Sequence, residues 1–125
     1  NGAKKFVNLN VSAAFHSRIM KKAEEKMKHK LSSFNFLDSI YSVVSNYSAG
    51  ATKDKNVIFN NLSKQMSNKV KWNESIKLLE KSNERNIIEI GPGKILTGLI
   101  RRISPNFILY NFNNIKDIDV LNNVI

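Results

Sequence analysis

The stretch NIIEIGPGKILTGLIRRISPNFILYN, residues 86–111, decides the fold. Its first five residues form a nearly continuous apolar run, which predicts a buried strand. The Gly-Pro-Gly sequence at 91–93 breaks the chain, and residues 94–103 then carry apolar side chains at helical spacing. A Ser-Pro pair ends this helix, because the residue before a proline disfavours helical backbone. Residues 106–111 predict another strand, and a strand–helix–strand order is typical of a parallel sheet.

Residues before this unit predict one more strand and three helices. The predicted helices are 18–31, 57–66 and 73–81, the predicted strand is Ile40–Ser45, and a polar loop is predicted at 46–56. Ser17 is expected to cap the first helix, and the tail from Ile115 predicts a last short helix. Three parallel strands would make a small sheet with exposed edges, which indicates that the chain is part of a larger α/β domain.

Composition limits the possible classes of protein. The chain has 125 residues, the size of one domain, and 42% of them are hydrophobic. It contains no cysteine, which excludes disulfides and cysteine-ligated zinc. No apolar run approaches the roughly 20 residues of a membrane span, so no membrane partner is expected. The net charge of +10 indicates an acidic partner or simple solubility. The lysines are scattered and no nucleic-acid-binding motif is present, so nucleic acid is not expected.

Two features could carry chemistry, and each has an ordinary structural alternative. The sequence GPGK at 91–94 resembles a phosphate-binding turn, but it lacks the spacing of known phosphate loops, which favours a tight strand-to-helix turn. His16 precedes a predicted helix, and it could be a general base or a structural histidine. His29 lies in a lysine-rich helix end and is expected to be solvated. No G-x-S-x-G sequence and no metal-ligand spacing is present, so no metal is predicted.

Four stretches, in their order and spacing, resemble the malonyl-CoA:acyl carrier protein transacylase family, which includes acyltransferase domains of polyketide and fatty-acid synthases. They are NVSAAFHSRIM at 10–20, VVSN at 43–46, the segment Gln65–Trp72 and EIGPGKILTGLIRRI at 89–103. The resemblance covers residues 2–112 and matches the C-terminal portion of longer enzymes. It implies part of an α/β-hydrolase-like domain with parallel strands and covering helices, and a ferredoxin-like small subdomain upstream. Within residues 1–125, it implies that 1–15 return from the small subdomain and 16–125 belong to the large one.

The resemblance implies transfer of a malonyl group through a malonyl-serine intermediate in fatty-acid biosynthesis. His16 would be the general base for that serine, and the main-chain carbonyl of Gln65 would orient its ring. Phe15 would select malonyl groups by crowding an α-methyl group, although plain core packing is its alternative. The serine nucleophile is expected in an upstream half of the same enzyme, so the chain by itself is expected to be inactive.

The resemblance also implies partners and substrates. Acyl carrier proteins are acidic, and basic patches speed such encounters. Lys4, Lys5, Arg101 and Arg102 match basic positions of the family's carrier-docking face, with solvated surface charge as the alternative for each. The implied substrates are malonyl-CoA and phosphopantetheinylated acyl carrier protein, with no bound cofactor.

Other functions stay open at this stage. The chain could belong to an acyltransferase domain of a polyketide or multidomain fatty-acid synthase. It could also be a non-catalytic interaction module that keeps the fold, or a basic nucleic-acid-binding domain. The frequent use of Lys, Asn and Ile suggests an A+T-rich genome, which predicts a bacterial cytoplasmic protein or, alternatively, a protein of a plastid-type organelle.

Overall fold

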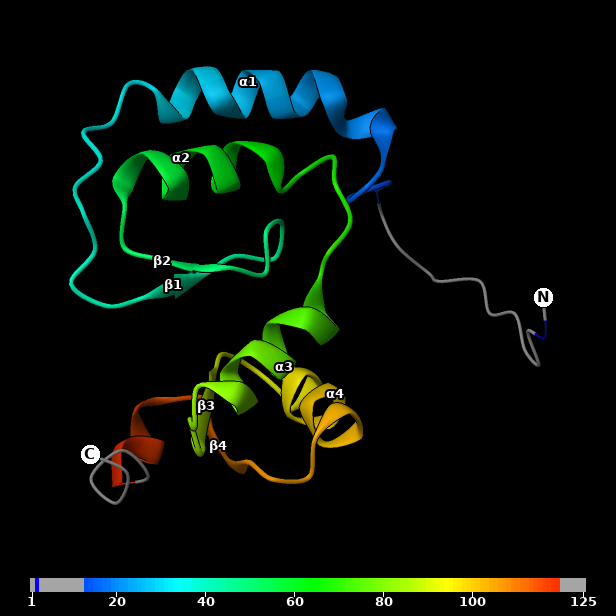
Figure 1. The fold of residues 1–125 in the computed structure, drawn as a ribbon, viewed down its shortest axis with the longest axis vertical. Helices are drawn as coiled ribbons and strands as arrows, with labels where there is room; N and C mark the ends of the chain where they lie inside the picture. The colour runs from blue at the N-terminus through cyan, green and yellow to red at the C-terminus, as the bar shows by residue number, and fades with distance from the viewer. Residues whose placement is uncertain (1, 3–12, 120–125) are drawn as a thin grey trace.

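The structure is a computed structural model that describes residue 2 and residues 13–119. The elements are, with η for a 3-10 turn, η1 (Arg18–Met20), α1 (Lys21–Leu31), β1 (Val43–Val44), β2 (Ala51–Thr52), α2 (Lys55–Lys64), α3 (Trp72–Lys81), β3 (Asn86–Ile90), α4 (Ile95–Ile103), β4 (Ile108–Phe112) and η2 (Ile115–Asp117). Figure 1 shows α1 and α2 side by side, and α3 and α4 together with β3 and β4. We call residues 13–71 the helical half and residues 72–119 the α/β half. No helix in the described part of the chain is long and apolar enough to cross a membrane.

The α/β half confirms the predicted strand–helix–strand unit. Strands β3 and β4 pair in parallel, with Asn86 opposite Ile108 at one end and Ile90 opposite Phe112 at the other. Helices α3 and α4 pack on each other and on these strands (Figure 1). Among the described residues, the buried hydrophobic side chains are Ile76, Ile100 and Phe107. All three lie in this half, so the hydrophobic core of the described chain is here.

The Gly-Pro-Gly sequence forms the connection between β3 and α4. Gly91 and Gly93 have φ angles of 131° and 96°, where glycine is favoured because it has no Cβ. Glu89 is buried at the end of β3, and its two carboxylate oxygens accept the backbone N–H groups of Leu96 (2.9 Å) and Thr97 (2.8 Å). The carboxylate therefore fills the position where a helix N-terminus could hold a phosphate. The turn is structural, as the sequence favoured.

The prediction of a third parallel strand at Ile40–Ser45 is wrong. Only Val43–Val44 forms a strand, and it pairs antiparallel with Ala51–Thr52, inside the segment predicted as a polar loop. The described residues thus form two separate two-stranded sheets. The physical reason is local: the backbone N–H of Ala49 donates to the carbonyl of Ser45, which reverses the chain immediately after β1. The strand therefore pairs with its own continuation, and Ile40 remains 81% exposed.

Two helix starts differ from the prediction. The first predicted helix begins with the 3-10 turn η1 before α1, and the Ser17 hydroxyl donates to the carbonyl of Ala14 (2.7 Å) instead of capping the helix. Helix α2 begins at Lys55, two residues earlier than predicted, because the carboxylate of Asp54 accepts two N–H groups of its first turn. Helices α3 and α4 and the short turn η2 agree with the prediction to within one residue at their starts.

Candidate functional site

His16 lies just before η1, on a backbone that is unfavourable for any residue with a side chain. Its φ angle is 63°, in the left-handed region, which costs on the order of 1 kcal/mol for an L-residue other than glycine. The backbone N–H of His16 donates to the carbonyl of Met66 (2.9 Å). This hydrogen bond joins the start of the helical half to the segment that follows α2. It fixes the position of the main chain that carries the imidazole.

The imidazole of His16 faces two main-chain carbonyls. Its Nδ1 lies 3.1 Å from the oxygen of Gln65 and 3.1 Å from the oxygen of Asn68. Both oxygens can only accept a hydrogen bond, so Nδ1 must carry the hydrogen and donate it to both. In the neutral ring, the lone pair is then on Nε2. The arrangement therefore orients Nε2 as a proton acceptor, which is what a general base presents.

The two carbonyls come from the chain just beyond α2. Gln65 directly follows the helix, where carbonyls lack a partner within the helix and can accept from elsewhere. The sequence prediction included the Gln65 carbonyl and missed that of Asn68. The position of Asn68 depends on the path of the chain after the helix ends, which helical spacing does not encode.

A cavity of about 480 Å³ opens next to the imidazole. The residues that line it are Phe15, His16, Met27, Leu31, Leu62, Gln65 and Met66. Phe15 is 55% exposed and its ring centroid lies 6.5 Å from that of His16. In this structure Phe15 is therefore a wall of the cavity and not part of the buried core. The lining is apolar apart from the imidazole and the amide of Gln65.

Of the four predicted basic residues, the structure describes Arg101 and Arg102, and both lie in the α/β half. Arg101 and Arg102 are exposed in the last turn of α4, where positive charge is favourable at a helix C-terminus. Lys4 and Lys5 lie outside the described residues, as does most of the segment 1–15 assigned to a small subdomain. Over residues 2 and 13–119, no cluster of three or more His, Asp or Glu residues is placed to hold a metal ion.

Sequence reasoning also missed a buried carboxylate near the site. Glu24 of α1 is 4% exposed, although glutamate is rarely buried without partners. A signal was present, because Glu24 lies on the same helix face as Met20, Met27 and Leu31. These four residues follow one another at intervals of four, three and four positions. A charged residue on an otherwise apolar stripe indicates a specific partner across the interface.

Comparisons with known proteins give one consistent answer. No family model matches the chain. The malonyl CoA-acyl carrier protein transacylase of Bacillus subtilis is 40% identical over 104 residues, which are 83% of this chain and 33% of that protein. The polyketide biosynthesis protein PksE of the same organism is 46% identical over 101 residues, 80% of this chain and 13% of that protein.

Solved structures agree with the sequence relatives. The acyl-carrier-protein S-malonyltransferase of Bartonella henselae has a TM-score of 0.88 at 34% identity, and the match covers 98% of this chain and 39% of that one. A malonyl-transacylase solved in complex with a type II polyketide synthase acyl carrier protein has a TM-score of 0.87 at 31% identity, covering 98% of this chain and 40% of that one.

These matches define the chain first as a relative of acyl-transferring enzymes. More narrowly, it is similar to malonyl-CoA:acyl carrier protein transacylases in both sequence and fold. The chain spans about a third to two fifths of the length of the curated transacylases that it matches.

Proposed function

We propose that this chain is the C-terminal portion of a malonyl-CoA:acyl carrier protein transacylase and supplies the general base of the reaction. One observation carries the proposal: the Nδ1–H of His16 faces the carbonyls of Gln65 and Asn68, which leaves Nε2 as the proton acceptor beside a cavity. The serine nucleophile is expected in the part of the enzyme that this chain does not cover.

In the proposed reaction, the serine oxygen attacks the thioester carbonyl of malonyl-CoA while Nε2 of His16 takes the hydroxyl proton. The C–S bond breaks, the imidazolium returns the proton to the CoA thiolate, and a malonyl-serine ester remains. Nε2 then accepts the proton of the phosphopantetheine thiol of acyl carrier protein, whose sulfur attacks the ester carbonyl. The ester C–O bond breaks, the imidazolium returns the proton to the serine oxygen, and the malonyl thioester of the carrier protein leaves. The carbonyls of Gln65 and Asn68 orient the ring and stabilise the imidazolium through Nδ1–H, as the third group of a catalytic triad does.

Selectivity for malonyl groups is assigned to Phe15. Its ring lines the cavity beside the imidazole, so it is placed to crowd a substituent on the acyl group. Exclusion of one extra methyl group in an apolar pocket is typically worth about 1–3 kcal/mol.

Acyl carrier protein is the proposed partner. A structural relative was solved as a complex of a malonyl-transacylase with its acyl carrier protein, which supports the assignment. The exposed arginines of α4, Arg101 and Arg102, are proposed contacts for its acidic surface. The roles of Lys4 and Lys5 and a cytoplasmic location stay predictions.

A synthase of polyketides is a second candidate, since the relative PksE is 46% identical over the matched residues. The chemistry of His16 would be the same there. The carrier protein that accepts the malonyl group would differ, so transfer to carrier proteins of fatty-acid and polyketide synthesis separates the two.

The test is the rate of malonyl transfer from malonyl-CoA to acyl carrier protein in the polypeptide that also contains the serine. His16→Ala is expected to lower this rate by about 10²–10⁴-fold, the usual contribution of a general base. The matched control is His29→Ala, because His29 is exposed near the end of α1 and is given no role. An unchanged rate in His16→Ala would refute the general-base role.

A further inference from the structure

We propose that Glu24 is a positioning residue for His16: its buried carboxylate holds the segment 67–68 so that the carbonyls after α2 meet Nδ1. This inference rests on the proposed function of His16 and extends it to a residue that the imidazole does not contact.

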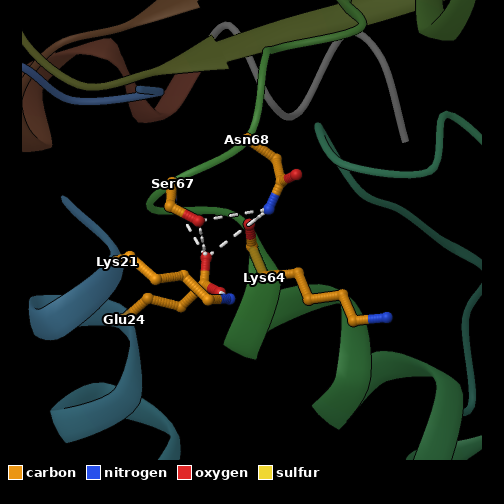
Figure 2. Close-up of polar contacts among 5 residues, drawn as sticks. All are labelled: Lys21, Glu24, Lys64, Ser67 and Asn68. Carbon is orange, nitrogen blue, oxygen red and sulfur yellow. Dashed lines mark hydrogen bonds and ion pairs between the residues drawn. The ribbon is translucent and has the colours of Figure 1, made fainter. Parts of the chain in front are cut away.

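The carboxylate of Glu24 collects hydrogen-bond donors from that segment (Figure 2). Its Oε2 accepts the backbone N–H of Ser67 (3.1 Å), the Ser67 hydroxyl, and the side-chain amide of Asn68 (3.5 Å). Its Oε1 accepts the ammonium of Lys21, one turn earlier on α1. The side-chain amide of Asn68 also donates to the carbonyl of Lys64 (2.7 Å), the last residue of α2. Both oxygens of the carboxylate are therefore used.

The same segment carries the acceptors for the imidazole. The side chain of Asn68 is bound to Glu24, and its main-chain carbonyl accepts the Nδ1–H of His16. Met66, which precedes Ser67, accepts the backbone N–H of His16. Residues 65–68 form a turn after α2, and within it the N–H of Gln65 donates to the carbonyl of Leu62 (3.4 Å). The contacts to Glu24 on one side and to His16 on the other add to this hydrogen bond in holding the carbonyls of the turn.

The carboxylate is held in its charged form. Burial by itself raises the pKa of Glu24, but the hydrogen bonds from Lys21 and Ser67 outweigh this effect and lower the pKa below its usual value. A charged acceptor forms stronger hydrogen bonds than a neutral one. Glu24 thus acts as a fixed acceptor at neutral pH, which suits a group that must hold neighbouring carbonyls in one orientation.

The tautomer of His16 reports this positioning directly. In the 125-residue chain labelled with ¹⁵N-histidine, the ring nitrogens of His16 and His29 can be assigned with a His29→Gln variant. Spectra recorded at about pH 8.5, two units above the pKa of histidine in model peptides, report the tautomers of neutral imidazole. We expect His16 to be in the Nδ1–H form and His29 to show the mixture of a solvated imidazole.

Glu24→Ala is expected to shift His16 toward the mixture shown by His29. Glu24→Gln keeps an oxygen for Ser67 and should retain more of the Nδ1–H form than Glu24→Ala does. The matched control is Glu25→Ala, because Glu25 is exposed and neighbours Glu24 on α1. The fluorescence of Trp72, which packs on the core of the α/β half, checks that this half stays folded. If Glu24→Ala destroys the fold, Ser67→Ala should give a smaller shift in the same direction.

Activity gives the second readout, in the polypeptide that contains the serine. Glu24→Ala is expected to lower kcat by up to about 10²-fold with little change in KM for malonyl-CoA, since a misplaced base slows chemistry and not binding. Glu24→Gln should recover part of kcat, and Glu25→Ala should match the parent.

The outcomes separate this inference from the proposed function. A full Nδ1–H form of His16 in both Glu24→Ala and Ser67→Ala would overturn the positioning role. A shifted tautomer in Glu24→Ala together with unchanged transfer in His16→Ala would support the positioning role and refute the general-base function.

Discussion

The α/β half holds an apolar cluster, in which Ile76 of α3, Ile100 of α4 and Phe107 are buried together. In the helical half, by contrast, the three most buried side chains are all polar, and five apolar side chains line an open cavity beside His16. Apolar burial stabilises without direction, whereas hydrogen bonds place particular atoms. The α/β half is thus expected to supply most of the chain's stability. The helical half is expected to supply the geometry of the candidate site around His16.

Truncation of a core side chain tests this division with the largest expected effect. Ile100→Ala is expected to lower the free energy of unfolding by about 2–5 kcal/mol, because the residue is 3% exposed and its removal leaves a cavity. Leu62→Ala, in the wall of the cavity beside His16, should cost less than about 1 kcal/mol because Leu62 is already 42% exposed. Urea unfolding followed by Trp72 fluorescence measures both. Equal losses would show that the helical half carries as much apolar stabilisation as the α/β half.

The sequence predicted the α/β half well for a local reason. Residues 86–111 contain a strand, a turn, a helix and the strand that pairs with the first, so most contacts of this unit lie within the pattern itself. The prediction of a parallel strand around Val43–Val44 was wrong because the chain reverses at Ser45–Ala49 and brings Ala51–Thr52 alongside as the partner. The apolar run itself does not encode this reversal.

The candidate site was predictable only in part. His16 and Gln65 followed from a resemblance to a family, and the structure brings the two within hydrogen-bond distance. Glu24 and Asn68 were missed because their contact joins α1 to a segment more than 40 positions further along the chain. Such a contact requires the packing of α1 on α2, which spacing within one helix cannot predict.

Acid should weaken the α/β half through Glu89. Its carboxylate accepts hydrogen bonds from Leu96, Thr97 and Asn111, so the charged form is favoured. The hydrogen bond from the Thr97 side chain is the main cause of a lowered pKa of Glu89, outweighing burial, which acts in the opposite direction. A lowered folded-state pKa means that the stabilisation is complete above the ordinary glutamate pKa, about 4.3, and is lost as pH falls through the folded value.

The measurement is the urea midpoint of the parent chain and of Glu89→Gln between neutral pH and about pH 3. At neutral pH the variant should be less stable, because an amide nitrogen would then face backbone N–H groups. The difference should narrow as the pH falls below about 4. Glu84→Gln, which changes an exposed carboxylate, is the control. A difference that stays constant over the whole range would contradict the assigned role of the charge.

The smallest effect concerns the two helix starts of the helical half, which the sequence and the structure assign differently. Asp54→Ala should lower the free energy of unfolding of this half by about 1 kcal/mol, because the carboxylate caps two N–H groups of α2. Ser17→Ala should leave helical content unchanged, since its hydroxyl donates to Ala14 and caps no helix. Far-UV circular dichroism during urea unfolding measures both variants. A loss of helix in Ser17→Ala equal to that in Asp54→Ala would restore Ser17 as a cap. It would also show that the start of α1, and not the segment after α2, sets the local structure around His16.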